Sequence, residues 1–440
     1  MGKVLSTKPA SGFRDFLGAE SRKRSDLIRK IESVYRSFGF ESLETPALEN
    51  LEVLLGSGGQ ENEKLIFKTL KRGEKLERAL EQKCSESDLS DLGLRFDLTV
   101  PLCRVVAEYS DKIPLPWKVF HFGPVWRAER PQKARYREFY QCDVDVIGTA
   151  SQAAELEVIE ALYGAFEACG VSSLELRLSD RRLLAACANA WGFGDRLGEF
   201  AIILDKKDKQ DTEALAKELR ELLGKALPRD LERALHEKVS LEEAVVWSQG
   251  AGESLFKLIE QLQDLSKAKY KVEFDLSLVR GMGYYTGVIF EWMQQGTDFA
   301  LGGGGRYDDL TSRFMKRAQP AVGGSLGFER LLLLLESESE SETNQPVFFP
   351  VMEESLRRSV TSVAREFQKR GLAVDLFVGE AKMKSQLKYA SQKNYRWVVF
   401  LGEEELRTGK FKIKDFRSGD EKSFSSLEEA VEAVRRGAAA

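Results

Sequence analysis

The chain has 440 residues, of which 42% are hydrophobic and 31% charged, and its formal net charge is −4. These values are ordinary for a globular protein, and the length predicts two or three domains with a substantial core. There is no global cationic field, so a nucleic acid would have to bind through local basic patches.

The cysteines and histidines exclude several kinds of site. The five cysteines are scattered and form no C-x-x-C pair, which argues against a disulfide framework or a zinc site. Only two histidines are present, so a metal site built on histidines or a His-based nucleophile dyad is not expected. No apolar run approaches the roughly 20 residues of a membrane span, and the N-terminus has no apolar signal core. We therefore expect a cytoplasmic protein with no membrane contact.

The first part of the chain alternates helical and strand-like patterns. Residues 20–38 have apolar side chains at helical spacing and are followed by a strand-like segment at 40–45 and by Pro46. A strand or hairpin is expected at 61–75 and a polar loop at 84–91. Residues 94–104, LRFDLTVPLCR, are predicted to form a strand that places Arg95, Asp97 and Thr99 on one face.

The chemistry of that face follows from its side chains. An inward aspartate beside a threonine hydroxyl is a good receptor for an ammonium group. A half-buried strand with a solvated polar face is the alternative.

The most informative segment is residues 125–148, VWRAERPQKARYREFYQCDVDVIG, which predicts a strand, a basic loop and a second strand. Alternation places Arg127 and Glu129 on one face of the first strand, and Gln141, Asp143 and Asp145 on one face of the second. Such a hairpin offers a fixed cation, an acceptor and an amide on one wall, which suits a phosphate and a small polar ligand. Alternating charge on a solvated hairpin is the competing interpretation.

The middle of the chain changes character twice. Helical periodicity dominates residues 180–265, with helices expected at 182–190, 211–223 and 251–265, and we interpret this part as an insertion between two halves of one domain. Two glycine-rich segments follow: residues 277–291, SLVRGMGYYTGVIFE, and residues 300–330, which contain GGGGRYDDL and end in GFER. Glycines allow the backbone to approach a ligand closely, whereas a glycine-rich turn feeding core side chains is the alternative.

The last hundred residues form a separate pattern. Residues 336–346 begin with alternating Glu and Ser and have the composition of a solvated linker. Strands are expected at 347–349, 373–378, 397–401 and 410–415, and helices at 353–370, 382–393 and 426–436. This alternation predicts a small α/β domain with a mixed or parallel sheet. The predicted division is therefore residues 1–335, a linker at 336–346, and residues 347–440.

The hairpin pattern RAERPQ-x-x-RYREF-x-Q resembles motif 2 of class II aminoacyl-tRNA synthetases, in the form typical of histidyl-tRNA synthetases. The helix, strand and proline of residues 20–46 resemble motif 1, which builds the dimer interface, although a helix packed on its own domain fits those residues nearly as well. Residues 277–291 resemble a motif peculiar to histidyl-tRNA synthetases and their closest relatives, with Gly283 where the family often has Asp. GFER resembles motif 3. The motifs follow the family's order over nearly the whole chain.

The resemblance implies an α/β class II catalytic domain, with an antiparallel sheet flanked by helices and the helical insertion at about 180–265, and a C-terminal α/β anticodon-binding domain. It implies that L-histidine and ATP form histidyl-adenylate, and that the histidyl group is then transferred to tRNA(His). Mg²⁺ is expected to bridge the ATP phosphates, no metal is expected on the protein's own side chains, and the chain is expected to act as a homodimer.

The resemblance also assigns roles to individual residues. Catalysis would fall to Arg127 and Arg280, since phosphate cannot be held by a P-loop, which the chain lacks. The implied contacts are, for ATP, Arg127, Glu129, Arg280 and Arg330; for histidine, Asp97, Thr99, Gln141, Asp145, Tyr284, Tyr285 and Tyr307; and for tRNA, Gln132, Lys133 and Arg137. Residues 382–389, KMKSQLKY, offer cations, amides and an aromatic ring that suit an unpaired anticodon loop.

Two alternatives come from other functional classes. A catalytically silent paralogue of this fold is a regulatory subunit of ATP phosphoribosyltransferase in histidine biosynthesis, and it lacks the anticodon domain. A tRNA-binding or sensor protein with a degenerate site is the other. Retention of Arg127, Glu129, Arg280 and Arg330 argues against both.

Overall fold

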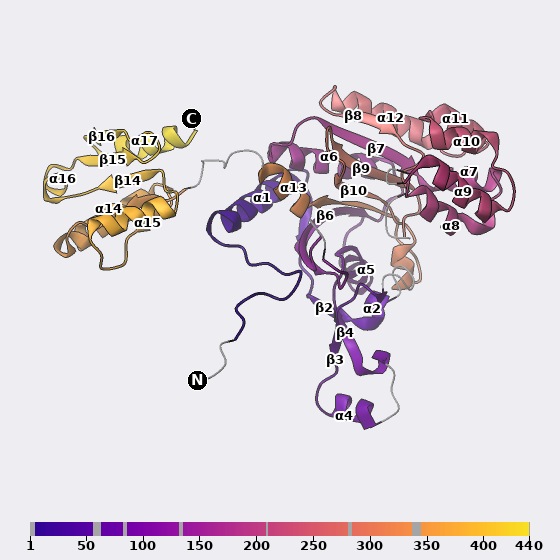
Figure 1. Cartoon of the computed structure of the whole chain (residues 1–440), viewed down its shortest axis with the longest axis horizontal. Coiled ribbons are helices and arrows are strands. Elements are labelled where there is room, and N and C mark those ends of the chain that lie inside the picture. The colour runs from indigo at the N-terminus through magenta and orange to yellow at the C-terminus, as the bar shows by residue number, and fades with distance from the viewer. Residues whose placement is uncertain are drawn as a thin grey trace. The chain divides into compact units, whose positions relative to one another are not determined.

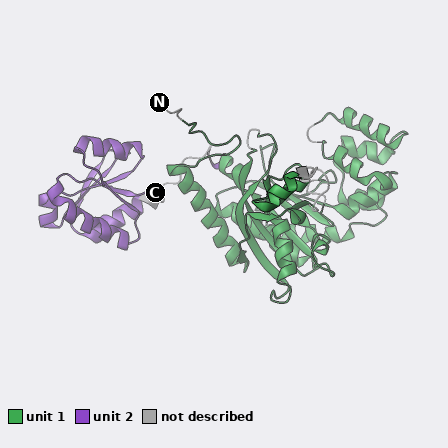
Figure 2. Ribbon diagram, turned by 90° about the horizontal axis from the view of Figure 1, so that it is seen from below, with its two compact units in different colours: residues 1–334 green, residues 335–440 purple. Residues whose placement is uncertain are grey.

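The computed structural model describes residues 5–55, 63–81, 86–131, 135–207, 210–279, 284–336 and 345–439. The chain divides into two compact units, Met1–Leu334 and Leu335–Ala440 (Figure 2). No helix in the described ranges is both long and apolar enough to cross a bilayer.

An eight-stranded sheet forms the centre of the first unit (Figure 1). Its strands are antiparallel except at the two edges, where β1 pairs parallel with β5 and β7 pairs parallel with β8. In spatial order they are β1 Glu41–Leu43, β5 Trp117–Trp126, β6 Glu138–Ile147, β11 Ala321–Gly327, β10 Ala300–Arg306, β9 Val288–Gln294, β7 Leu174–Asp180 and β8 Lys271–Phe274. This mainly antiparallel sheet with helices around it confirms the predicted fold class.

One face of this sheet is apolar and is covered by two helices, α1 Gly18–Ser37 and α6 Ala153–Ala168. Tyr35 of α1 is fully buried, and its hydroxyl donates to the Cys142 carbonyl of β6. Gly302 and Gly324 leave room for α6, since a Cβ on Gly324 would lie 2.7 Å from Leu162. Burial of this face supplies the main apolar core of the unit.

The opposite face is polar, as the strand register shows. Directly paired residues on neighbouring strands point to the same side of a sheet. One row of such residues crosses six strands from β5 to β7: His121, Asp143, Ser325, Gly303, Glu291 and Arg177. Gly303 has no side chain in the middle of this row, and a Cβ there would lie 2.7 Å from the Phe290 carbonyl oxygen.

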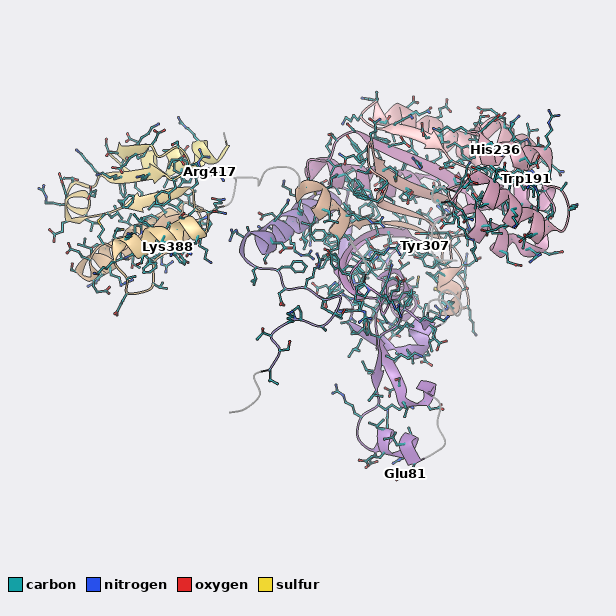
Figure 3. The ribbon with its side chains drawn as sticks, in the orientation of Figure 1. Glu81, Trp191, His236, Tyr307, Lys388 and Arg417 are labelled. Carbon is teal, nitrogen blue, oxygen red and sulfur yellow. The ribbon has the colours of Figure 1, made fainter. Side chains whose placement is uncertain are left out.

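A smaller three-stranded sheet is formed by β2 Leu48–Asn50, β4 Ser90–Leu94 and β3 Lys68–Leu70. It is accompanied by α2 Leu51–Leu55, α4 Glu74–Glu81, the 3₁₀ turn Glu86–Leu89 and α5 Thr99–Glu108. The β3–α4 part projects from the unit, and Glu81 lies at its end (Figure 3). The strand or hairpin expected at 61–75 is therefore strand only at β3, and residues 61 and 62 lie outside the described part.

The prediction of a strand over residues 94–104 was wrong. β4 ends at Leu94 and α5 begins at Thr99, because Asp97 Oδ1 accepts from the Val100 N–H at 3.1 Å and so caps the first turn. Pro101 fits that first turn, where its missing N–H removes no intrahelical bond. Arg95, Asp97 and Thr99 thus share no strand face, and Arg95 is buried with its guanidinium donating to the Thr45 and Pro124 carbonyls.

Six helices lie between β7 and the edge strand β8 in the described sequence, together on one side of the sheet (Figure 1). They are α7 Arg181–Ala190, α8 Leu197–Leu204, α9 Thr212–Leu223, α10 Arg229–His236, α11 Leu241–Trp247 and α12 Glu253–Ser266. The helices predicted at 182–190, 211–223 and 251–265 correspond to α7, α9 and α12. The other three are short and were not anticipated.

The second unit is built on a five-stranded mixed sheet in the order β13 Val374–Leu376, β12 Val347–Phe349, β14 Trp397–Phe400, β15 Phe411–Asp415 and β16 Glu421–Phe424. The first three strands are parallel and the last two pairings are antiparallel. The helices are α14 Arg357–Lys369, α15 Met383–Gln392, α16 Glu403–Thr408 and α17 Leu427–Ala439. The mixed sheet was predicted, whereas β16 and α16 were not.

A buried ion pair fastens α6 to β10 on the side of the sheet that the helices cover. Arg306 Nε and Nη2 donate to the two oxygens of Glu155 at 2.7 and 2.6 Å, and both side chains are at most 6% exposed. Replacing Glu155 by Ala leaves the buried guanidinium with only the more exposed Asp308 as a carboxylate partner, so we expect a loss of about 3 kcal/mol in the free energy of unfolding. Urea denaturation measures it.

The control lies two residues away on the same helix. Glu157 pairs with Lys118 at 2.6 Å, but its side chain is 45% exposed. Glu157→Ala should cost about 1 kcal/mol or less. Equal losses for the two variants would mean that Arg306–Glu155 does not fasten the helix.

Candidate active site

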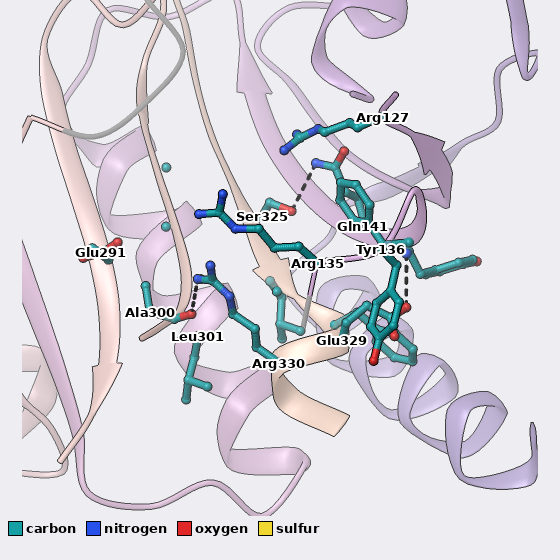
Figure 4. A pocket seen from close by; sticks show the side chains of 18 of the residues that line it. Arg127, Arg135, Tyr136, Gln141, Glu291, Ala300, Leu301, Ser325, Glu329 and Arg330 are labelled. Atoms are coloured by element: carbon teal, nitrogen blue, oxygen red, sulfur yellow. Dashed lines mark hydrogen bonds between the residues drawn. The ribbon is translucent and has the colours of Figure 1, made fainter. Parts of the chain in front are cut away.

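A cavity of about 480 Å³ opens on the polar face of the large sheet. Its walls are the ends of the β5–β6 hairpin, strands β10 and β11, and the start of α13 Phe328–Glu336 (Figure 4). Gly302, Gly303 and Gly304 form part of its lining, so the backbone of β10 is exposed to any ligand bound there.

Arginines dominate one part of this cavity. Figure 4 shows the guanidinium groups of Arg127, Arg135 and Arg330 extending into it, with Glu291 on the opposite wall. Arg127 is held by a bond from Nε to the Phe96 carbonyl at 3.2 Å, and Arg330 by a bond from Nη1 to the Ala300 carbonyl at 2.7 Å. Several fixed guanidinium groups facing one space suit a phosphate-bearing ligand, because planar forks match phosphate oxygens.

Arg127 and Glu129 do not lie on a strand face, contrary to prediction. β5 ends at Trp126, and both residues belong to the connection that follows it. Arg127 nevertheless stays at the wall, because its N–H donates to the Arg137 carbonyl at 2.8 Å and extends the hairpin pairing. Glu129 is exposed at the rim of the cavity.

Arg137 is the one predicted tRNA contact that lies within the described residues. Arg137 Nε donates to the Glu129 carbonyl at 3.0 Å and Nη1 to the Ser11 carbonyl at 3.4 Å, so this side chain braces the hairpin. Gln132, Lys133 and Arg280 lie outside the described residues.

A cluster of arginines from the N-terminal segment holds Glu329 beside the cavity. Arg24 of α1 donates to both carboxylate oxygens at 3.0 and 3.1 Å, and Arg14 also pairs with Glu329. The Arg14 guanidinium stacks on the ring of Tyr136, with Cζ 3.2 Å from the ring centroid. The wall that carries Arg330 is therefore fixed from three parts of the chain.

A second part of the polar face is rich in acids. Asp97, Asp143 and Asp145 are all buried, with exposed fractions of 1%, 4% and 3%. Tyr307 donates its hydroxyl to Asp145 Oδ1 at 2.5 Å, whereas Asp97 Oδ2, Asp145 Oδ2 and Gln141 Oε1 are buried with no partner among the described residues. Buried acceptors without donors are costly, so this pocket is suited to a ligand that brings donors or positive charge.

Burial also shifts the titration of these acids. It raises the pKa of Asp97 to about 6 and that of Asp143 to about 7, and it raises the pKa of Asp145 well above its usual range. Arg127 opposes the shift at Asp97 and Asp143, which shows that its charge reaches both carboxylates. Arg127 therefore lies at the boundary between the acidic pocket and the arginine-lined cavity.

Three tyrosines and a threonine complete the acidic pocket. The rings of Tyr284 and Tyr285 are 4.9 Å apart, the Tyr284 and Tyr307 rings are 5.9 Å apart, and Thr99 hydrogen-bonds Tyr284. Gly323 faces Asp145 across the β6–β11 pairing, and a Cβ there would lie 1.7 Å from Asp145 Oδ1. Only glycine leaves space for that carboxylate.

The structure thus brings most of the predicted ligand-contacting side chains to one face of the sheet. Those at the acidic pocket are Asp97, Thr99, Gln141, Asp145, Tyr284, Tyr285 and Tyr307, and those at the cavity are Arg127, Glu129 and Arg330. Asp143, Glu291 and Arg135 were not among the predicted ligand-contacting residues. The alternation with Gln141 and Asp145 was a usable signal for Asp143, whereas Glu291 needed the strand register.

The raised pKa of Asp143 predicts that the stability of the fold depends on pH. A carboxyl group whose pKa is raised from its ordinary 3.8 to about 7 stabilises the fold fully below about pH 4, and this contribution is lost as pH rises through about 7. Asp143→Asn removes the ionisation, so at pH 8 the variant should be more stable than the natural chain by on the order of a few kcal/mol. Thermal melts at several pH values measure this.

The gain should shrink toward zero as the pH falls to about 4. Asp298 is exposed, and Asp298→Asn should change stability by no more than about 0.5 kcal/mol at either pH. A constant difference between Asp143→Asn and the natural chain across this range would show that Asp143 is not forced to ionise in a buried place.

Comparisons with known proteins agree with the geometry. The family model for histidyl-tRNA synthetase matches residues 12–331, and the model for an anticodon binding domain matches residues 345–437. The histidine–tRNA ligase of Christiangramia forsetii is 34% identical, over 97% of this chain and 100% of that protein. That of Wolinella succinogenes is 33% identical, over 98% of each.

Solved structures show the same fold. The crystal structure of histidyl-tRNA synthetase from Nostoc sp. PCC 7120 superposes with a TM-score of 0.82 at 24% identity, covering 99% of this chain and 100% of that one. A Bacillus halodurans structure described as an ATP phosphoribosyltransferase regulatory subunit/histidyl-tRNA synthetase has a TM-score of 0.71 at 24% identity, covering 89% of this chain and 97% of that one.

Proposed function

Because the chain belongs to the histidyl-tRNA synthetase family, a family of class II aminoacyl-tRNA ligases, we propose that the polar face of its large sheet is where histidine reacts with ATP before transfer to tRNA. The ligase activity follows from full-length relatives above 30% identity, and the anticodon-binding match at residues 345–437 goes with it. The residues that perform each step are our proposal.

One observation supports this use of the site above all others. A pocket of three buried carboxylates with unsatisfied acceptors adjoins a cavity lined by arginines, and Arg127 lies between them. Histidine carries an ammonium group and a carboxylate on its α-carbon and a ring N–H at the end of its side chain, whereas ATP carries a polyphosphate. The two halves of the site match these charges, and they bring the amino-acid carboxylate and the phosphate together at Arg127.

In the acidic half, Asp97, Thr99 and Gln141 would hold the α-ammonium group. Asp145 would accept from an imidazole N–H through Oδ2, since its other oxygen is occupied by Tyr307. Tyr285 lies against the same pocket and would contact the ring. Fixing both ends of the substrate leaves its carboxylate directed toward Arg127.

In the arginine half, Arg330 would lie over the adenine and Glu129 would accept from the exocyclic amine. Arg127 would bind the α-phosphate together with Arg280. The histidine carboxylate is already a nucleophile, so no general base is needed, and the reaction depends on positioning and on stabilising charge at the phosphate. Tyr136 and Glu329 hold the wall on which Arg330 is placed.

Mg²⁺ is the ion that we propose to accompany ATP. Among the described residues no three His, Cys, Asp or Glu side chains form a group that could hold a metal by themselves. Glu291 is 7% exposed and lies on the cavity wall, and one carboxylate together with phosphate oxygens and water is the ligand set that Mg²⁺ prefers. The ion would neutralise phosphate charge when ATP is bound.

The second unit would read the anticodon of tRNA(His). Within the segment 382–389, Gln386 is buried and bonds both the N–H and the carbonyl of Val351, and Tyr389 donates to Asp375 at 2.8 Å. These two side chains therefore hold the fold, while Lys384 and Lys388 are exposed and would meet the nucleic acid.

Assembly and location are also proposals. We infer a homodimer, because α1 and the edge strand β1 have the motif 1 arrangement and because Leu48 and Leu115 are large apolar side chains left 42% and 43% exposed. We infer a cytoplasmic location, since the product serves protein synthesis. A regulatory-subunit role is less well supported, because the anticodon-binding domain and the site arginines Arg127 and Arg330 are present.

Histidine-dependent ATP–pyrophosphate exchange by the purified chain tests the activation step. Asp145→Ala would leave an imidazole N–H without its acceptor in a buried pocket, costing roughly 1–3 kcal/mol of histidine binding. The KM for histidine should rise about 5- to 150-fold while the KM for ATP changes little. Glu129→Ala is the matched control and should raise the KM for ATP more than the KM for histidine. An unchanged KM for histidine in Asp145→Ala would remove the assignment.

Arg280 is the subject of a further prediction. A donor that binds the α-phosphate more strongly in the transition state than in the ground state is worth roughly 10²–10³ in rate. Arg280→Ala should slow single-turnover adenylate formation by about that factor, with substrate binding less affected. Arg280→Lys should restore only part of the rate, because lysine cannot offer two parallel donors. A loss below about threefold for the Ala variant would show that another cation performs this task.

A further inference from the structure

We propose that Asp143 is a positioning residue, which sets the side-chain amide of Gln141 so that its carbonyl oxygen faces the substrate ammonium group. This inference deepens the proposed function and rests on it, since it concerns the histidine pocket. Asp143 would act by holding the Gln141 side chain and would not contact the substrate itself.

The contacts around the amide are one-sided. Gln141 Nε2 donates to Asp143 Oδ1 and Oδ2 at 3.2 and 3.3 Å and lies 3.5 Å from Ser325 Oγ (Figure 4). Gln141 Oε1 is buried and has no partner among the described residues. Asp143 is 4% exposed and follows Gln141 by two residues on the same face of β6, so this pairing is fixed by the strand itself.

The carboxylate decides which end of the amide faces the pocket. Above about pH 7 Asp143 is ionised, and a carboxylate accepts hydrogen bonds and cannot donate them, so the amide turns its NH₂ group toward Asp143 and binding is compared at pH 8. Ser325 does not decide the orientation, because a hydroxyl can donate or accept. The reversed amide would place its carbonyl oxygen against two carboxylate oxygens and its NH₂ group against an incoming ammonium group.

The acceptor so presented has a specific consequence for the ligand. Asp97 Oδ2 and Gln141 Oε1 are both left as unpartnered acceptors in the same acidic region. An ammonium group has three donors and no acceptor, so it can satisfy both acceptors at once, whereas a ligand with no donor at this place leaves them unsatisfied. The amide orientation therefore favours amino acids over analogues that lack the α-amino group.

The experiment compares Asp143→Asn with the natural chain on two ligands. Asparagine can accept from the Gln141 NH₂ group or donate to the Gln141 carbonyl, so the amide is no longer held in one orientation. Histidine binding should weaken about 5- to 10-fold, the range of an ordinary hydrogen bond that is made only part of the time. Inhibition by 3-(imidazol-4-yl)propionate, which keeps the ring and carboxylate but has no amino group, should change less than about threefold. The kcat should fall much less than kcat/KM.

Two further variants separate positioning from direct contact. If Asp143 acts through Gln141, Asp143→Asn should have no further effect on the KM for histidine in a Gln141→Ala background. The exchanged pair Gln141→Glu with Asp143→Asn should recover histidine binding, since the amide of residue 143 now donates to a carboxylate whose second oxygen faces the pocket. Both results concern binding of the substrate ammonium group. A change in the stability of the fold would not produce them.

The outcomes are distinct from those that test the proposed function. Absence of histidine-dependent exchange in the natural chain would refute the proposed function. Normal exchange with equal weakening of histidine and the deaminated analogue in Asp143→Asn would overturn the positioning role alone. The same follows if the Asp143→Asn effect persists at full size without Gln141, because Asp143 would then contact the substrate itself.

Discussion

Three carboxyl groups are buried on one face of the large sheet, and the rest of the first unit must hold them there. Ionising Asp97, Asp143 and Asp145 in a place with few donors is unfavourable, as the raised pKa values of all three show. A mobile segment would relieve this cost by turning such groups to water. Two of them instead lie on β6, which is paired along its length with β5 and β11, and the apolar side of the same sheet is closed by α1 and α6. Packing on one face thus maintains an unfavourable arrangement on the other.

The polar face places opposite charges next to each other without letting them neutralise. Arg127 is close enough to influence Asp97 and Asp143, yet its Nε is committed to the Phe96 carbonyl and its guanidinium lies against the Phe139 ring. The buried acceptors of the acidic pocket consequently still lack hydrogen-bond donors. A ligand with a positive and a negative end fits across this boundary, whereas a ligand with only one of these charges leaves half of the boundary unsatisfied.

Much of this arrangement could be predicted from the sequence, and the failures have identifiable physical causes. Alternation along β6 correctly placed Gln141 and Asp145 on one face, because a paired strand has no other way to orient its side chains. The segment after β4 was misjudged, since Asp97 bonds its own backbone three residues on and starts a helix, and period-two alternation does not reveal such a local bond. Glu291 and the glycine opposite Asp145 depend on which strands are neighbours, and that long-range pairing is not written in any local pattern.

The attachment of the six-helix segment has an evolutionary consequence. The chain leaves the sheet at the end of β7 and returns at β8, and these two strands lie side by side at the edge farthest from β5 and β6. A segment inserted between the edge strand and its neighbour can lengthen, shorten or be exchanged for another fold without altering the register of the central strands. Changes in this segment can therefore accumulate while the arrangement of side chains on the polar face is preserved.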